Sequence, residues 1–435
     1  MSKVLIVSYY FPPFNGPGAQ HPDFFFRFLR EEGFETTAVT SAVYYNPNAA
    51  PPELVPRGPG VSYLPERGWV RALCPRLYKT EMQIQVRRGR WQPGFLWAKL
   101  FAVGAAERLL ARGGSNVMIS VSPPVSSHWA ALKLKKRFPK LFWIADFQDP
   151  FVGNPFDAKS TDRERRFERE LFSLADVLSA NTDTAMAMWR ERYPEFAGKM
   201  IVTWGGYDPE EEVRALPLGS SAPVLSHVGV IFGARVPAAL LASIARLSES
   251  RCLKRGDLVA EFVGDLDFGA LAGLAQKLAA EGWVRMRPIY VPRAEALRVA
   301  GQAHYSLLLD ITPGDANLQA PAKLFDQIRI GRPVLAFTAE NSPAGRILER
   351  SGIAHVRLRP DDLPERVDAG VLELLRMSSE PQQASEWFRE TFDARRQAAV
   401  LGGVIRRGGL LETVGRRVGN PPQVGNLPHD RLGDG

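Results

Sequence analysis

Short runs of β-branched and other apolar residues alternate with segments of helical periodicity along almost the whole chain. This alternation is typical of parallel sheets joined by crossover helices. In the first half the pattern predicts strands at Val4–Tyr10, Thr36–Ser41, Val117–Val121, Leu141–Phe147, Val177–Asn181 and Met200–Trp204, and helices at Asp23–Glu32, Ser126–Phe138, Arg163–Ala175 and Thr184–Arg192.

The same rhythm starts again at Val224. It predicts strands at Val224–Val230, Leu258–Gly264, Val284–Ile289, Ser306–Ile311, Val334–Thr338 and Ala354–Leu358, and helices at Pro237–Leu247, Leu271–Glu281, Ala294–Ala303, Ala322–Ile330, Ala344–Arg350 and Asp361–Met377. An amphipathic helix over Gln382–Ala399 follows, and a Gly/Pro/Arg-rich tail after Arg406 is expected to be flexible.

These series predict two Rossmann-like α/β domains that face a central cleft. The expected organisation is an N-terminal domain over 1–208 with a long insertion at 44–92, a linker over 209–223, a C-terminal domain over 224–381, a last helix over 382–405 and a tail over 406–435. A length of 435 residues suits two domains of roughly 200 residues each.

Composition narrows the class of protein. Apolar residues make up 45% of the chain and charged residues 23%, which is ordinary for a globular protein. Cys74 and Cys252 are the two cysteines, so neither a disulfide framework nor a zinc cluster is expected. The first apolar run is too short for a signal peptide, and no run spans a bilayer. We therefore expect a cytoplasmic protein.

Basic residues concentrate in one stretch of the chain. Residues 51–140 hold 16 Lys/Arg and four Glu, whereas the net charge of the whole chain is +8. The stretch is either a solvated helical surface or a patch for an anionic membrane surface or a phosphorylated acceptor. Nucleic acid is not expected as a partner, because no helix-turn-helix, finger or RNP motif accompanies the charge.

A glycine-containing turn follows the first predicted strand. Gly16 and Gly18 stand between that strand and the next helix, where backbone N–H groups can approach a phosphate or a sugar. A dinucleotide fingerprint would need a third glycine at His21 and an acidic residue after the second strand, where Thr40 and Ser41 stand. This pattern disfavours an NAD site.

The segment over 316–334 reads ANLQAPAKLFDQIRIGRPV. Pro321 stands where a first helical residue belongs, so the helix beginning there offers free N–H groups and a positive dipole end to a diphosphate. Lys323 adds a cation, and Asp326 lies one turn further on the same face, where a carboxylate can bind ribose hydroxyls. Alternatively, this is an ordinary surface helix with an ion pair between Lys323 and Asp326.

Several motifs in register suggest a known family. Together with that segment, the chain carries SYYFPPFNGPGAQ, SVSPPVSSH, WIADFQDPF, LADVLSANT and GGYD. From residue 1 to about 399 it resembles glycosyltransferase family 4, retaining enzymes of GT-B fold, in the branch with a PxKLxE-like donor helix. The resemblance implies that the C-terminal lobe binds a nucleotide sugar, the N-terminal lobe binds the acceptor, and the last helix crosses back onto the N-terminal lobe.

The resemblance also assigns site residues. Asp326 takes the place of the second glutamate of the family's E-x7-E motif, which holds the ribose, whereas Leu318 replaces the first glutamate. Arg235 matches one of the family's two phosphate-binding cations, and Val230 occupies the place of the other. The turn at 205–208 matches an NGxD-type turn, and base recognition is expected near Pro288–Tyr290.

Candidate side chains in the N-terminal domain lie near strand ends. Asp146 and Asp149 end a predicted strand, and Asp149 is a candidate for orienting the acceptor hydroxyl or taking its proton; capping the next turn is the alternative. His128, at the start of a helix, is a candidate for pointing into the cleft, with His21 and His304 ranked lower. A structural histidine is the alternative for each.

The resulting prediction is a glycosyltransferase that moves a sugar from a UDP- or GDP-sugar to a glycan or lipid-linked acceptor of a surface polysaccharide, with retention. The resemblance implies no metal, because N–H groups and cations can stabilise the leaving diphosphate. Two alternatives stay open. One is a nucleotide-sugar epimerase, and the other is a catalytically inactive scaffold of an assembly complex.

Overall fold

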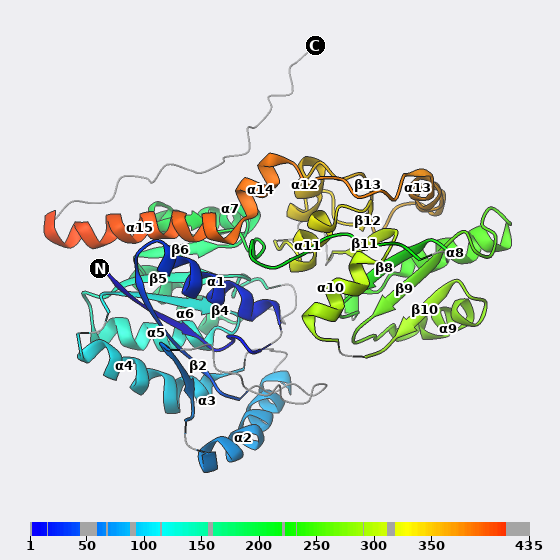
Figure 1. The fold of residues 1–435 in the computed structure, drawn as a ribbon. Helices are drawn as coiled ribbons and strands as arrows, with labels where there is room; N and C mark the ends of the chain where they lie inside the picture. The colour runs from blue at the N-terminus through cyan, green and yellow to red at the C-terminus, as the bar shows by residue number, and fades with distance from the viewer. Residues whose placement is uncertain are drawn as a thin grey trace.

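The protein folds into two α/β lobes side by side (Figure 1). The computed structural model describes residues 2–14, 16–43, 59–66, 68–87, 93–113, 115–154, 160–219, 222–231, 233–289, 291–310 and 318–414. Within these ranges the strands form two sheets, of seven and six strands, in which every pairing is parallel. No helix in the described part is long and apolar enough to cross a membrane.

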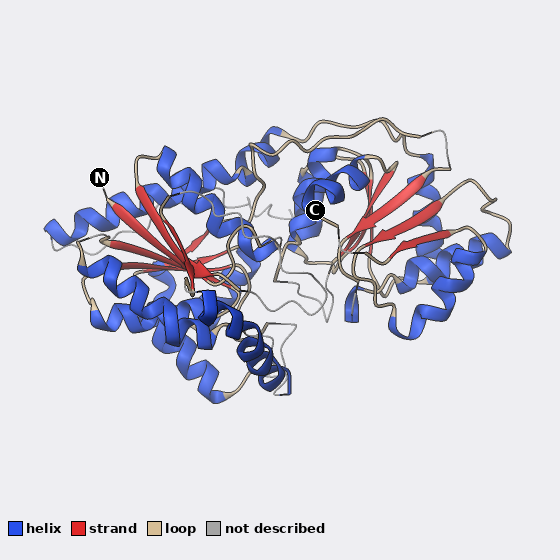
Figure 2. Cartoon of the chain, turned by 60° about the horizontal axis from the view of Figure 1, so that its bottom comes forward, coloured by secondary structure: helices blue, strands red, loops and turns tan. Residues whose placement is uncertain are grey.

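The N-terminal sheet has the order β3-β2-β1-β4-β5-β6-β7. Its strands are buried on both faces, as expected where helices cover a parallel sheet on both sides (Figure 2). The elements are β1 (Lys3–Ser8), α1 (Pro17–Glu31), β2 (Glu35–Ser41), β3 (Val61–Leu64), α2 (Gly68–Arg87), α3 (Phe95–Trp97), the π-helical turn η1 (Ala98–Ala102), α4 (Val103–Ala111), β4 (Val117–Ser122), α5 (Ser126–Arg137), β5 (Phe142–Phe147), α6 (Asp162–Leu174), β6 (Val177–Ala180), α7 (Asp183–Arg192), η2 (Pro194–Lys199) and β7 (Met200–Val202).

The C-terminal sheet has the order β10-β9-β8-β11-β12-β13, around a second apolar core. Its elements are β8 (Val224–Val228), η3 (Gly233–Arg235), α8 (Ala238–Glu249), β9 (Val259–Val263), η4 (Gly269–Leu271), α9 (Ala272–Ala280), β10 (Val284–Arg287), α10 (Arg293–Gly301), β11 (Tyr305–Leu309), α11 (Ala322–Ile330), β12 (Val334–Phe337), α12 (Pro343–Arg350), β13 (His355–Leu358) and α13 (Pro364–Arg376). Both sheets reverse their strand order at the first strand of the lobe, which confirms two Rossmann-like domains.

The insertion contributes regular structure that the sequence pattern did not predict. Within 44–92, β3 adds an edge strand beside β2, and α2 projects at the lower side of the N-terminal lobe (Figure 1). Residues 44–58, 67 and 88–92 of the insertion lie outside the described part. The helix predicted at Asp23–Glu32 also begins earlier than expected, at Pro17, because proline suits the first turn of a helix.

The last helices cross from the C-terminal lobe back to the N-terminal lobe. The single helix predicted over Gln382–Ala399 is instead two helices, α14 (Glu386–Phe392) and α15 (Ala394–Val414), which are separated at Asp393. Helix α15 lies alongside α1 (Figure 1). The helix therefore extends beyond residue 406, where a flexible tail was expected; residues 415–435 lie outside the described part.

Candidate functional site

The carboxyl ends of the two sheets meet at the seam between the lobes. The Thr182 hydroxyl, which follows β6, donates to the Leu318 carbonyl before α11 at 2.6 Å. The Arg346 guanidinium of α12 donates to the Asp183 carboxylate at 2.7 Å and to the Thr184 hydroxyl at 2.9 Å. Since ligand sites of open α/β sheets lie beyond the carboxyl ends of the strands, this seam is where a site is expected.

Helix α11 begins at the seam, at Ala322 as its periodicity predicted, but Pro321 is not its first helical residue as expected. Pro321 is the N-cap residue, with extended backbone, and Ala322 is the first helical residue. The N–H group of Leu324 already donates to the Pro321 carbonyl at 2.9 Å, so the first-turn N–H groups of Ala322 and Lys323 are the ones suited to an anion. Gly331 ends the helix in the left-handed conformation, with φ of 81°.

The predicted cation of α11, Lys323, bonds to a histidine rather than to Asp326. Its amine lies 3.0 Å from Nε2 of His227, a fully buried residue of β8. Nδ1 of His227 lies 3.2 Å from the Leu307 carbonyl, which can only accept, so Nδ1 carries the ring proton and Nε2 accepts from Lys323. Burial and the charge of Arg235 lower the pKa of Lys323 to about 7.

Glycine 229 makes room for that amine. Its φ is +136°, and a Cβ at this position would lie 2.6 Å from the Lys323 amine. Burial, followed by the charge of Lys323, lowers the pKa of His227 well below its usual range, so the ring stays neutral. Lys323 is thus held at the end of β8 by a neutral acceptor, beside the amino end of α11.

Arg235 brings a second cation to the same place. Burial lowers its pKa, and the negative charges of Asp310 and Asp149 oppose that effect. Asp310 ends β11 and accepts from the Ser342 hydroxyl, whereas Asp149 follows β5 in the other lobe. Arg235 therefore interacts electrostatically with two other predicted residues that are distant in the sequence, Lys323 in its own lobe and Asp149 in the other.

Asp326 lies further along α11 and is engaged by an arginine. Arg293, at the start of α10, donates to both Asp326 oxygens at 2.9 and 3.1 Å, and also to Glu211 of the linker at 2.5 to 3.0 Å. Burial raises the pKa of Asp326, and Arg293 opposes that shift. Burial lowers the pKa of Arg293, but the hydrogen bonds to Glu211 and the charge of Asp326 outweigh burial, so the pKa of Arg293 is raised.

The residue that departs from the family pattern, Leu318, joins the two lobes. Its side chain is partly buried against the core of the N-terminal lobe, and its carbonyl accepts from Thr182. A glutamate at this position would place a carboxylate against apolar side chains, at a cost in free energy. Residues 311–317, which precede it, lie outside the described part.

The glycine-containing turn is shaped by aromatic rings. A Cβ on Gly16 would lie 2.5 Å from the Phe14 ring, and one on Gly18 would lie 3.2 Å from the Tyr10 ring. The Tyr10 and Phe14 rings stack with centroids 4.5 Å apart. Because neither glycine has a side chain, the backbone at the start of α1 can approach the Tyr10 and Phe14 rings closely. Asn15 of the turn lies outside the described part.

Two of the candidate histidines occupy the interior. His128 does not point into the cleft, so that prediction is wrong. It is fully buried, lies 2.7 Å from the Ser120 hydroxyl and packs on the Phe147 ring, and burial lowers its pKa to about 3. His21 is also buried, with Nδ1 3.1 Å from an Asp146 oxygen. Asp146 therefore pairs with α1 rather than facing the seam.

His304 and the turn at 205–208 have structural contacts. The Val224 N–H donates to Nδ1 of His304 at 3.2 Å, at the start of β8. Gly206 has φ of +67°, and a Cβ there would lie 2.4 Å from the Phe392 carbonyl. The Asp208 carboxylate accepts from Arg27 of α1 at 2.5 Å. Glycine is thus required in this turn by its close approach to α14.

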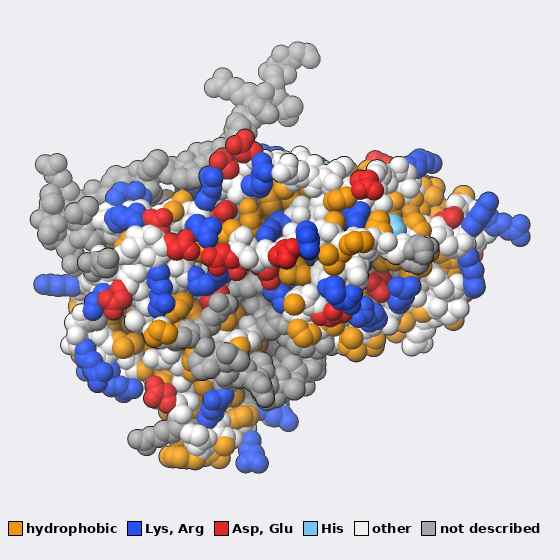
Figure 3. All heavy atoms as spheres, viewed as in Figure 1, with side chains coloured by type: hydrophobic (Ala, Val, Ile, Leu, Met, Phe, Trp, Pro, Cys, Tyr) orange, Lys and Arg blue, Asp and Glu red, His pale blue; other side chains and the backbone are white. Residues whose placement is uncertain are grey.

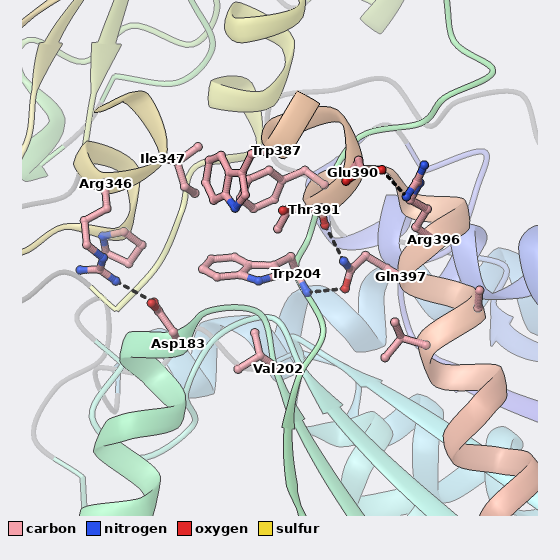
Figure 4. Close-up of a pocket in the computed structure, with 14 residues that line it drawn as sticks. Asp183, Val202, Trp204, Arg346, Ile347, Trp387, Glu390, Thr391, Arg396 and Gln397 are labelled. Carbon is pink, nitrogen blue, oxygen red and sulfur yellow. Dashed lines mark hydrogen bonds and ion pairs between the residues drawn. The ribbon is translucent and has the colours of Figure 1, made fainter. Parts of the chain in front are cut away.

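A cavity of about 380 Å³ lies at another part of the seam, between α7, α12, α14 and α15. Trp204 and Trp387 line it, with the Arg346–Asp183 ion pair at its side (Figure 4). Its other polar groups are also paired: Gln397 accepts from the Trp204 N–H at 3.1 Å. This cavity is separate from the cations at α11 and contains none of the predicted site residues.

Comparisons with known proteins identify the fold. No family model and no curated protein matches the chain. Solved structures match along its length: HepE from Anabaena in complex with UDP (TM-score 0.58, 11% identity, 94% of this chain and 100% of that one), α,α-trehalose 6-phosphate synthase from Burkholderia multivorans (0.60, 13%, 97% and 100%), and a candidate UDP-N-acetylglucosamine 2-epimerase from Listeria monocytogenes (0.53, 12%, 95% and 97%).

These likenesses and the two sheets show the GT-B fold, as the sequence predicted. At these identities they establish the fold alone. Membership of family 4 stays a prediction, since no family model matches.

Sequence reasoning missed the partners of the predicted residues. Lys323 bonds to His227, which is 96 residues away in the sequence. Asp326 bonds to Arg293, which in turn bonds to Glu211. A buried strand position gives no signal that a histidine there accepts from a lysine. The predicted base site is described only in part, because Tyr290 lies outside the described residues.

Proposed function

We propose that the protein is a glycosyltransferase that takes a sugar from a UDP- or GDP-sugar. The observation that carries the proposal is the cluster formed by Lys323, Arg235 and the amino end of α11 at the carboxyl edge of the C-terminal sheet. Two cations and free helix N–H groups suit a diphosphate, whose charge they would stabilise as it leaves the sugar. No metal is needed for that step.

The nucleoside would lie beside this cluster. Val230 follows β8 and Ile289 follows β10, on either side of β9 in the same sheet, and both are exposed apolar side chains. They offer a surface on which a base can rest, while Asp326 lies one turn further along α11 for the ribose. Arg293 would then fix the orientation of the Asp326 carboxylate rather than replace the ribose as its partner.

The acceptor would approach from the N-terminal lobe. Asp149 interacts electrostatically with Arg235 from the other lobe, which supports a role for its carboxylate in orienting an acceptor hydroxyl beside the departing diphosphate. Gly16 and Gly18 would lie on the same side. We propose that transfer proceeds with retention, and that the acceptor is a glycan or lipid-linked sugar of a surface polysaccharide made at the inner face of the membrane.

Calorimetry with UDP and GDP tests the donor site. Lys323→Ala is expected to weaken nucleotide binding about tenfold or more, because it removes a charge-assisted hydrogen bond to phosphate. Lys277→Ala, on the exposed side of α9, is the matched control and should leave affinity unchanged. Unchanged nucleotide affinity of Lys323→Ala would contradict the placement of the diphosphate. If the wild-type protein bound neither UDP nor GDP, the enzyme proposal would be contradicted.

An inactive scaffold is the second candidate, because Leu318 and Val230 stand where the family has a glutamate and a cation. A scaffold that still binds nucleotide would show no hydrolysis of any nucleotide sugar over long incubation. A glycosyltransferase would release nucleotide slowly from one donor, and Asp149→Asn would reduce acceptor-dependent turnover more than donor binding.

A further inference from the structure

A row of apolar side chains lies on the solvent side of α2. Trp69, Leu73, Leu77 and Ile84 are between 45% and 68% exposed. With 3.6 residues per turn these four positions fall within an arc of roughly 80°. Single exposed apolar residues are common, but four on one helical face form a continuous stripe. We call this the outer stripe of α2.

The opposite side of α2 is firmly packed, so the helix has a fixed orientation. Cys74, Tyr78 and Met82 are buried, the first two in the core of the N-terminal lobe. The Glu81 carboxylate is turned inward, where it accepts from the backbone N–H groups of Gly94 at 3.2 Å and Leu96 at 3.0 Å. The outer stripe therefore faces solvent because the other face is already used.

The charges around the outer stripe are of one sign. Arg76, Lys79 and Arg87 are exposed on or beside this face of α2, and Arg71 is exposed on another side of the helix. The helix contains one acidic residue, the inward-facing Glu81. Apolar side chains gather at the lower end of the N-terminal lobe with Lys and Arg side chains around them (Figure 3). The surface of α2 is thus both apolar and cationic.

The other basic cluster of the 51–140 stretch is partly neutralised by local ion pairs. At the end of α5, Lys135 pairs with Asp176 at 2.8 Å and Arg137 with Glu107 at 2.8 Å, while Lys136 pairs with Glu170. Trp97, in the same stretch of sequence, is fully buried. Among the described residues, no ion pair neutralises the exposed cations of α2, and these cations lie on the same helix as the outer stripe.

We propose that the outer stripe of α2 docks on an anionic lipid surface. A helix with an apolar face bordered by Lys and Arg lies in the interface plane of a bilayer, with its apolar side chains among the acyl chains and its cations near the anionic headgroups. A Trp ring suits the boundary between the two. Resting on the proposed function, this docking would hold the acceptor lobe against a membrane that carries a lipid-linked acceptor.

Vesicle co-sedimentation of the full chain tests the proposal. The wild-type protein should bind vesicles of phosphatidylcholine with about 30% phosphatidylglycerol, and bind pure phosphatidylcholine vesicles about tenfold less. The double variant Leu73→Glu/Leu77→Glu should lose binding to the anionic vesicles about tenfold or more. Both side chains are exposed, so the variant should fold, as unchanged circular dichroism and unchanged thermal unfolding will show.

The matched control is Leu363→Glu, because Leu363 is an exposed apolar residue of the C-terminal lobe, 73% exposed. It should bind anionic vesicles as the wild type does. The proposal would be overturned if the wild-type protein bound neither type of vesicle. It would also be overturned if the double variant bound the anionic vesicles as well as the wild type does. A wild-type dimer that the double variant converts to monomer would overturn it too, because the stripe would then be an interface between two copies.

Nucleotide binding in the same samples separates the two proposals. If vesicle binding is lost in the double variant while UDP or GDP still binds, the docking surface is supported independently of the active site. If neither nucleotide binds the wild type but anionic vesicles do, the proposed enzyme fails and the docking surface stands.

Discussion

The contact between Lys323 and His227 sets the charge of the proposed donor site. A neutral imidazole accepts from the amine, while Arg235 repels its charge and burial disfavours it. In the empty site, a substantial fraction of the Lys323 amine is therefore neutral near pH 7. A diphosphate would favour the charged amine, so binding would be coupled to protonation of Lys323.

Nucleotide affinity should consequently fall as the pH rises. With the pKa of Lys323 at about 7, the amine is charged below pH 7 and progressively neutral above it. We expect the affinity for UDP or GDP to be nearly constant just below pH 7 and to fall about tenfold per pH unit above it. Above the pKa, the fraction of Lys323 that is charged falls tenfold with each pH unit. Calorimetry between pH 6.5 and about 9 measures this slope.

Lys323→Arg is the control for the pH dependence, because arginine stays charged over the whole range. Its affinity should be lower at neutral pH but independent of pH. An equal slope in the wild type and in Lys323→Arg would show that another group titrates, and the coupling would then be rejected.

At the residue scale, sequence reasoning located cations and carboxylates better than it located their contacts. Lys323 and Asp149 were predicted from local signals and Arg235 from the family resemblance, and in the structure Arg235 interacts electrostatically with both. The direction of His128 was predicted wrongly, because a place in the first turn of a helix does not fix which side of the helix is buried. His227 was not predicted, because its partner arises only from tertiary packing.

At the element scale, the junction of α14 and α15 is an apolar centre between the lobes. The fully buried Phe392 ring packs edge-on against Trp204 and Trp387, with centroids 5.2 and 5.3 Å away, and lies 5.1 Å from Phe325. These neighbours come from the N-terminal lobe, α14 and α11. Phe392 therefore links the crossover helices to the donor helix.

Phe392→Ala should destabilise the protein by about 3–5 kcal/mol, the range for removing a buried aromatic ring. Urea unfolding followed by tryptophan fluorescence and circular dichroism measures the loss. Trp69→Ala serves as the comparison: its side chain is 68% exposed, so the change should be within about 0.5 kcal/mol. Similar losses in the two variants would contradict the packing described for Phe392.

Elements with clear periodicity were predictable, and elements in unusual contexts were not. The strand at Val117 and the helix at Ala322 begin where the pattern placed them. Helix α2 was not predicted because Pro75 lies inside it in a Pro/Gly/Arg-rich stretch. The break at Asp393 was not predicted either, because it arises from backbone pairing with a distant turn rather than from a local breaker.

At the scale of the whole molecule, polar contacts fasten the lobes on either side of the crossover. Arg346 of the C-terminal lobe pairs with Asp183 of the N-terminal lobe at 2.7 Å. On the other side, Arg329 donates to the backbone carbonyls of Asp208 and Glu211, and Arg27 pairs with Asp208 and Glu210. The two Rossmann-like domains followed from the sequence periodicity and the GT-B fold from the family resemblance, but these contacts required the structure.

A double-mutant cycle should detect the contact between the lobes. For Arg346→Ala and Asp183→Ala, we expect a coupling of about 0.5–1 kcal/mol in the free energy of unfolding, because both side chains are partly exposed. The coupling should shrink at high salt. The exposed pair Arg359–Asp361 lies within one lobe and should show no measurable coupling; equal coupling in both pairs would contradict a special contribution from the seam.

The two chain segments that pass between the lobes are hydrogen-bonded to each other. The Tyr207 N–H donates to the Phe392 carbonyl at 2.8 Å, and the Ala394 N–H donates to the Tyr207 carbonyl at 3.0 Å. We expect a double strand of this kind to resist stretching more than rotation, so that a rotation of the lobes would use it as a pivot. Groups close to the pivot would keep their spacing when the lobes rotate, and groups farther along the seam would separate on a longer lever arm. A chain cut before Asp393 would leave the lobes on a single tether and remove the fixed axis.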